Sequence, residues 1–176
     1  MDQLVKATAA NGQLRAFAAV TTDVVAEALR RHDCWPVAAA ALGRTMTGAL
    51  LFAANLKNKE SVTIKLKGDG PLGTVTADAT AEGSVRGCVD HPHVNLPLNE
   101  SGKIDVGGGI GAGILAVTRF TGLKEPVTGS VDITNGEIAE DLINYLYTSE
   151  QTPSSIGLGV LVSPELKCLG AGGFFV

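Results

Sequence analysis

One stretch, residues 35–56, constrains the fold more than any other part of the chain. Pro36 stands where helices often begin, because its fixed φ and missing N–H cost nothing at the first helical position. Apolar residues then recur at alternating steps of three and four, the spacing of one helical face; they are Trp35, Ala39, Leu42, Met46, Ala49, Ala53 and Leu56. Residues 48–54 are apolar on every side, which indicates a helix enclosed by other elements. We therefore predict a buried central helix over about 36–56.

The same stretch is almost long enough to cross a bilayer, which requires about 20 apolar residues. Arg44 lies in its middle, however, and a charge at that depth costs roughly 2.5 to 3.5 kcal/mol on insertion scales. The many alanine and glycine residues of the stretch offset little of that cost. We therefore favour a buried helix of a soluble domain over a membrane span.

Strand patterns precede and follow this helix. Residues 4–20 predict a β-hairpin that turns at Asn11-Gly12, and a short helix follows from Asp23. A second long helix is predicted over 137–148, with Asn135 as its cap. Alternating residues predict further strands over 62–66, 74–78, 84–89, 114–120, 127–133 and 156–162. The fold class is therefore α+β, with antiparallel β-sheets packed around the central helix.

Two features of the C-terminal third indicate how the central helix packs and whether the protein continues beyond residue 176. Gly157 and Gly159 leave one face of the strand 156–162 nearly bare, and we expect the central helix to lie against that face. The chain finishes on an apolar strand, residues 172–176, without a polar end. We therefore expect residues 1–176 to be a single domain from the front of a longer protein.

Charge and cysteine content narrow the possible partners and compartment. The 14 Lys and Arg against 18 Asp and Glu give a net charge of −4, and the charges are dispersed. Phosphate binding relies on clustered cations, so no nucleic-acid partner is expected; Arg30-Arg31-His32 suits a helix C-terminus instead. Cys34, Cys88 and Cys168 are odd in number and form no C-x-x-C pair, and no secretory signal is apparent. A reducing, cytoplasmic setting fits best.

A glycine-rich motif nominally matches a dinucleotide fingerprint, Gly107-x-Gly109-x-x-Ala112. That fingerprint works only between a strand and a helix whose N-terminus holds the pyrophosphate. A strand pattern follows here, so we predict a flexible loop. The sequence contains no P-loop and no nucleophile elbow, and Ser154 and Ser155 have no identifiable partner base.

Two cysteine-containing sites also have a plainer explanation. Zinc commonly binds the side-chain types found at Cys88, Asp90, His91 and His93, but no second ligand pair lies elsewhere, and we expect ordinary loop residues. Cys34 precedes the central helix, where the helix dipole could lower its pKa, but it has no resolving cysteine nearby and we expect an inert thiol. We therefore assign no catalytic residue, no cofactor-binding residue and no metal ligand, and we expect no enzyme.

Several stretches carry a family resemblance that covers essentially the whole chain in order. They are Trp35-Pro36, residues 41–45 (ALGRT), 122–126 (GLKEP), 136–141 (GEIAED), 149–154 (SEQTPS), 157–162 (GLGVLV) and 171–174 (AGGF). On these residues the chain resembles the N-terminal core domain of the 33 kDa chaperonin family, the redox-regulated heat-shock holdases of the bacterial cytosol. The resemblance implies an α+β core followed by a linker and a C-terminal zinc domain.

The resemblance also implies a mechanism. In that family four cysteines, in C-x-C and C-x-x-C motifs, hold zinc, and oxidants convert them to disulfides. Zinc then leaves, the linker loosens, and the core presents apolar surface to unfolding clients without ATP; dimers are the active form. None of the three cysteines here matches those motifs, so zinc is expected only in a domain beyond residue 176.

We therefore expect an ATP-independent holdase core that binds unfolding proteins under heat or oxidative stress, as a homodimer. The sequence does not identify the client-contacting residues; we expect an apolar patch, offered by the strand meander of residues 61–89. Two alternatives stay open: a small-molecule enzyme or binding domain with a pocket near Gly107–Gly113, and a purely dimerising structural domain. An enzyme should show a deep polar pocket with convergent titratable groups.

Overall fold

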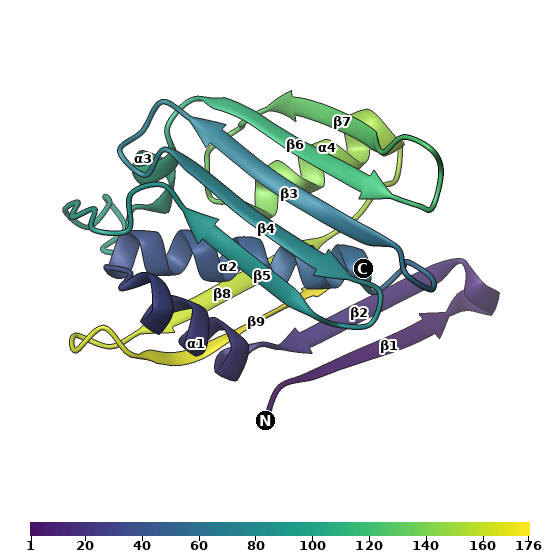
Figure 1. Cartoon of the computed structure of the whole chain (residues 1–176), viewed down its shortest axis with the longest axis horizontal. Coiled ribbons are helices and arrows are strands. Elements are labelled where there is room, and N and C mark those ends of the chain that lie inside the picture. Colours follow the sequence, from purple (N-terminus) through teal and green to yellow (C-terminus); the bar gives the residue numbers. More distant parts are fainter.

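The central helix α2 (Pro36–Ala53) lies between two antiparallel β-sheets in the computed structural model, which describes residues 1–176 (Figure 1). One sheet has the strand order β1 (Gln3–Ala9), β2 (Leu14–Val20), β9 (Cys168–Phe175) and β8 (Ile156–Val162). The other has the order β5 (Val85–Val89), β4 (Thr74–Thr80), β3 (Ser61–Gly68), β6 (Gly113–Phe120) and β7 (Val127–Asp132). We call them the four-stranded and the five-stranded sheet. The predicted α+β class is confirmed.

Three shorter helices complete the fold. Helices α1 (Thr22–His32) and α4 (Ala139–Glu150) share the middle layer with α2, since α1 packs against β9, β5 and α2, and α4 packs against β7, β8 and α2. Helix α3 (Val106–Ile110) is a single short turn against α2 and β3. The molecule is therefore a sheet–helix–sheet sandwich with no helix on the outside of either sheet (Figure 1).

The enclosure of α2 confirms the prediction made from its composition. All of its residues except Pro36 and Arg44 are buried. By length and composition α2 could cross a membrane, but 89% of the 18-residue stretch is buried inside the fold. The helix ends at Ala53, earlier than predicted. Trp35, which helical spacing placed on the buried face, stands at the N-cap position and is 39% exposed, because the chain is still extended there.

Glycines let α2 approach both sheets closely. A Cβ atom built on Gly43 would lie 2.7 Å from a methyl carbon of Val160 in β8 and 2.9 Å from one of Val25 in α1. A Cβ on Gly87 in β5 would lie 2.8 Å from Cδ1 of Leu42. Any larger side chain at these positions would push α2 away from its neighbours.

The four-stranded sheet meets α2 with the face opposite to the one we predicted. Ile156 is buried on the inner face of β8, and Leu158 on the same face lies near Gly48 of α2. Gly157 and Gly159 point outward instead. The ring of Phe174 lies over Gly157, whereas nothing lies within 4 Å of a Cβ on Gly159. Large side chains bury more apolar area against the helix than glycines can, so they take the inner face.

The N-terminal hairpin forms as predicted, but its turn is longer. Ala9 pairs with Leu14, which leaves a four-residue connection containing η1 (Ala10–Gly12) instead of a two-residue turn. Ala10, Asn11 and Gly12 all have positive φ, at 50°, 56° and 85°. The Asn-Gly signal therefore located the turn without fixing its length.

Helices α1 and α4 each begin at a carboxylate that does not belong to the N-cap residue. The two oxygens of Asp2 accept hydrogen bonds from the backbone N–H groups of Asp23 and Val24, each at 2.8 Å, at the start of α1. Before α4, the fully buried Asp141 accepts from the N–H groups of Ile138 at 2.8 Å and of Thr134 at 2.7 Å. The prediction of Asn135 as the cap was wrong.

The one charged residue of α2 is held by a residue at the entrance to α4. Arg44 Nη1 donates to Glu137 Oε2 at 2.6 Å, and Glu137 Oε1 accepts from the N–H of Gly107 in α3 at 3.2 Å. The two side chains are only 18% and 36% exposed, and Arg44 Nε has no hydrogen-bond partner. Glu137 therefore joins α2, α3 and the segment before α4.

We predict that Glu137→Ala lowers the free energy of unfolding by about 1–2 kcal/mol, because it leaves a half-buried cation without its carboxylate. Urea denaturation measures the change. Glu82→Ala, at an exposed turn position, is the matched control and should change stability by less than about 0.5 kcal/mol. Arg44→Met combined with Glu137→Ala should recover part of the loss, and a double variant as unstable as the sum of both single variants would contradict this account.

Candidate functional site: an uncovered apolar sheet face

Each sheet has an outer face without a helix (Figure 1). The side chains on the two outer faces differ in chemistry. On the five-stranded sheet, the outward positions of β3 and β4 carry hydroxyl and charged side chains: Ser61, Thr63, Lys65, Lys67, Thr74, Thr76, Asp78 and Thr80. Asp78 accepts from Thr63 Oγ1 at 2.6 Å and pairs with Arg86 at 3.0 Å. The exposed large apolar side chains on this face, Ile114 and Phe120 of β6, stand six residues apart next to Lys67 and Ser61, so the face as a whole is an ordinary solvated surface.

The outer face of the four-stranded sheet is apolar across all four strands. We call it the apolar face and define it by the outward positions Val5, Ala7, Ala9, Leu14, Ala16, Ala18, Val20, Gly157, Gly159, Leu161, Gly170, Gly172 and Phe174. Its large side chains, Val5, Leu14, Val20, Leu161 and Phe174, are between 46% and 62% exposed. No charged residue stands on this outer face, and its one polar residue is Gln3, at the start of β1.

The strand register makes the apolar face continuous. Val5 pairs with Ala18, Ala18 with Phe174, and Phe174 with Gly157, so one row crosses the whole sheet. Phe174 fills the space that Gly157 leaves, and alanines and glycines keep most of the remaining surface low. A contiguous apolar surface on a soluble protein generally marks an interaction site.

The prediction that the meander of residues 61–89 offers the apolar patch was wrong. Its apolar residues, among them Val62, Ile64 and Leu66, are fully buried on the inner face of the sheet, next to α2. Its outward residues are the hydroxyl and charged side chains described above. The clean alternation of these strands already indicated one buried and one solvated face.

We did not predict the apolar face, although part of it is visible in the sequence. Leu14, Ala16, Ala18 and Val20 alternate with a second set that includes Phe17 and Ala19, so both faces of β2 are apolar. Phe17 and Ala19 are the buried ones. A strand that is apolar on both faces and pairs at the outside of a sandwich must expose one of them.

The glycine-rich segment is packed rather than flexible, contrary to the prediction. Residues 106–110 form α3, and a Cβ on Gly109 would lie 2.6 Å from Val37 of α2. A Cβ on Gly107 would collide with the carbonyl oxygen of Asn135. The order is helix then strand, the reverse of a dinucleotide fingerprint. Five surface cavities of about 300 to 580 Å³ are all lined by other residues, so none of these five supports the alternative of a binding site at Gly107–Gly113.

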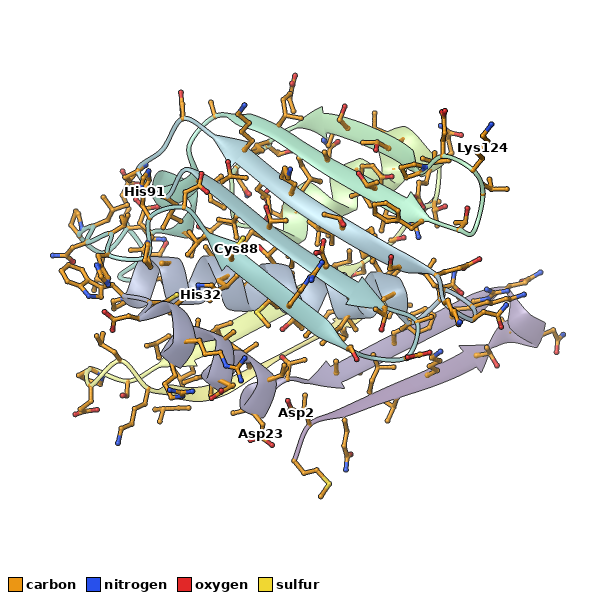
Figure 2. All side chains as sticks on the ribbon, in the orientation of Figure 1. Asp2, Asp23, His32, Cys88, His91 and Lys124 are labelled. Atoms are coloured by element: carbon orange, nitrogen blue, oxygen red, sulfur yellow. The ribbon has the colours of Figure 1, made fainter.

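The four zinc-type residues do not converge. Cys88 is exposed on β5, away from His91 in the loop beyond the strand (Figure 2). Asp90 accepts from the N–H of Thr74 at 2.8 Å, and His93 pairs with Asp33 at 2.8 Å. Nowhere in residues 1–176 do three or more His, Cys, Asp or Glu side chains gather closely enough to hold a metal ion.

The three cysteines are free thiols in different surroundings. Cys34 is buried, and its burial, reinforced by the negative charge of Asp33, raises its pKa from 9.0 to about 11. Burial also raises the pKa of Cys168, which is half-buried. These shifts are opposite to the lowering that makes a cysteine reactive.

We predict that Cys34 is the slowest of the three cysteines to react with iodoacetamide at pH 8. A pKa near 11 instead of 9.0 makes its thiolate about a hundredfold rarer at that pH. Since the protonated thiol is favoured by folding, its contribution to stability is present below pH 9.0 and is lost as the pH rises toward 11. Mass spectrometry of the alkylated protein measures the order, and equal rates in urea are the control. A Cys34 that reacts as fast as the exposed Cys88 would contradict this prediction.

Comparisons with known proteins agree with this architecture along the whole chain. The family model described as "Hsp33 protein" matches residues 2–176. The 33 kDa chaperonin of Bacillus velezensis is 51% identical over 177 residues, covering 100% of this chain, and that of Desulforamulus reducens is 52% identical over 175 residues, covering 99%. The chain spans 61% and 60% of the length of these two relatives.

A solved structure shares the same fold. The crystal structure of the 33 kDa chaperonin from Thermotoga maritima superposes with a TM-score of 0.94 at 43% sequence identity. The match covers 98% of this chain and 59% of that one. With the sheet–helix–sheet sandwich and the family model in agreement, the chain belongs to the Hsp33 family.

Proposed function

We propose that the chain is the core of an ATP-independent chaperone that holds unfolding proteins on its apolar face. The observation that carries the proposal is that all four strands present an apolar, charge-free outer surface that no helix covers. An unfolding protein exposes apolar side chains, and their burial is favourable by about 25 cal/mol per Å² without any nucleotide. A surface of alanine, glycine and a few large side chains can accept many different sequences.

The names of the relatives support the same class of activity, because both are called 33 kDa chaperonins. We infer that the chain functions in the cytoplasm, acts as a homodimer and works under heat or oxidative stress. We further propose that redox control lies in a zinc-binding domain outside residues 1–176. The basis is that the three cysteines here form no ligand cluster and that the relatives are longer.

The test is a light-scattering assay with a heat-unfolded client and no nucleotide. We expect the wild-type chain to suppress aggregation. The double variant Leu14→Asp with Leu161→Asp should require at least about fivefold more protein for the same suppression, because each change puts a charge where apolar contact is needed. Leu98→Asp combined with Leu123→Asp is the matched control, because both residues are at least as exposed, at 62% and 71%, but lie in loops outside the apolar face.

Equal suppression by the two double variants would contradict the proposal. Sedimentation of the wild-type chain distinguishes the chaperone proposal from the alternative of a purely dimerising structural domain. In that alternative a second copy covers the apolar face permanently, so the chain forms a dimer through this face and does not suppress aggregation. Circular dichroism checks that both variants are folded.

We also predict that hydrogen peroxide and zinc chelators leave suppression by this chain nearly unchanged. No residue cluster here can hold zinc, and Cys34 is buried. The measurement is the same assay with each reagent added and removed before the client is heated. A marked gain of activity after oxidation would show that the cysteines of this chain control client binding.

A further inference from the structure

Strand β1 exposes an unpaired edge. It pairs with β2 alone, in an unbroken register from Gln3↔Val20 to Ala9↔Leu14. No residue of β1 exchanges a backbone hydrogen bond with any other segment. Alternate N–H and C=O groups along this seven-residue strand therefore point outward without a partner.

The sequence of β1 does little to block pairing with another chain. Natural edge strands are commonly protected by charged side chains (lysine above all), proline, bulges, short length or a covering helix. Of these devices β1 carries only one, Lys6, which repels another cationic strand but not an acidic one. Strand β1 (QLVKATA) has no proline and no bulge, and no helix packs closely against it, whereas the other edge strands, β5, β7 and β8, each lie against α1 or α4. Figure 1 shows the hairpin reaching beyond the end of α2.

The inner side of the β1 edge is positively charged. Lys6, Arg15 and Lys57 line one hollow of about 310 Å³ between the hairpin and the end of α2, and no acidic side chain lines it. None of the three cations forms a salt bridge. Arg15 donates to the amide oxygen of Asn55, and the nearby Glu60 accepts from the backbone N–H of Lys57 rather than from its ammonium group.

The dipole of α2 does not balance this charge. The C-terminal end of a helix carries roughly half a negative charge, and α2 has no basic residue of its own in the last turn. The three full positive charges exceed this half charge and the single negative charge of the nearby Glu60 taken together, so the hollow is net positive. The opposite side of the same strand, with Val5, Ala7 and Ala9, is part of the apolar face and carries no charge.

We propose that the edge of β1 binds an extended segment of an unfolded protein as a fifth strand of this sheet. The segment has apolar residues on the side that continues the apolar face and acidic residues on the side that meets Lys6, Arg15 and Lys57. This inference rests on the proposed chaperone function and adds a binding mode and a charge preference to it. Backbone hydrogen bonds supply sequence-independent affinity, and alternate side chains supply the preference.

A second copy of this chain is a poor occupant of the same edge. Two antiparallel β1 strands related by a two-fold axis would place their Lys6 residues on the same face, directly opposite or on a diagonal in any well-overlapped register. Like charges across a strand pair are destabilising. An acidic segment from another protein removes that repulsion.

The test uses two fluorescent peptides, Val-Glu-Val-Thr-Val-Glu-Val and its counterpart with lysine in place of glutamate, titrated with the full chain in an anisotropy assay. We expect the wild-type chain to bind the glutamate peptide more tightly than the lysine peptide. In the Lys6→Glu variant, the affinity for the glutamate peptide should fall and the affinity for the lysine peptide should rise, each by about fivefold, which is the range of exposed ion pairs. Lys6→Gln should give intermediate values. Lys65→Glu, the same charge reversal on the exposed face of β3, should change neither.

Hydrogen–deuterium exchange then locates the pairing. The glutamate peptide should slow exchange in residues 3–9 but not in residues 156–162 of the opposite edge. The inference is overturned if Lys6→Glu has no effect on either peptide, if protection appears away from β1, or if β1 is protected without peptide in a dimer of the chain. Loss of aggregation suppression with intact peptide binding would instead refute only the proposed function.

Discussion

The fold depends on a single layer of helices that covers one face of each sheet. Because α2, α1 and α4 all lie between the sheets, both outer faces must meet solvent or another molecule (Figure 1). The five-stranded sheet meets solvent with threonine, serine and charged residues. The four-stranded sheet has apolar residues on both sides, so the sandwich itself leaves its outer side exposed. Burying that side requires a surface from elsewhere, which is the physical basis for a protein-binding function.

Polar groups inside the sandwich fix how its layers fit together. Thr47 of α2 bonds the hydroxyl of Thr21 at 2.7 Å, just before α1. Glu150 at the end of α4 accepts from Arg119 of β6 at 2.8 Å and from Tyr145 at 3.0 Å; burial, together with Glu150, raises the pKa of Tyr145 to about 12. The Thr47–Thr21 and Arg119–Glu150 contacts join elements distant in sequence, and the Tyr145–Glu150 contact holds the Glu150 carboxylate within α4. A smooth apolar helix could slide between two sheets, whereas these directional bonds define one position.

The elements were largely predictable from the sequence, and their faces and ends less so. Helical spacing and uniform apolarity identified α2, and period-two alternation identified the strands, because both signals are local. The outward orientation of Gly157 depends on Phe174, which comes from the neighbouring strand, so no local pattern contains it. The cap at α4 comes from Asp141, inside the helix, instead of from Asn135 before it. We did not predict the apolar face because it depends on the order of the strands in the sheet, which cannot be read from a single sequence.

The carboxylate of Asp2 has a mechanical consequence for the N-terminal hairpin. It fastens the start of β1 to α1 at one end (Figure 2), while the turn at residues 10–13 at the other end is fully exposed. Nearer the tip, Arg15 ties the hairpin to Asn55, just beyond the end of α2, through one hydrogen bond of 3.1 Å, and the pairing of β2 with β9 runs over Phe17–Val20, toward the base. The hairpin is therefore anchored most firmly at its base, and any outward bend opens the hollow lined by Lys57 and Arg15 more than the region near Leu4.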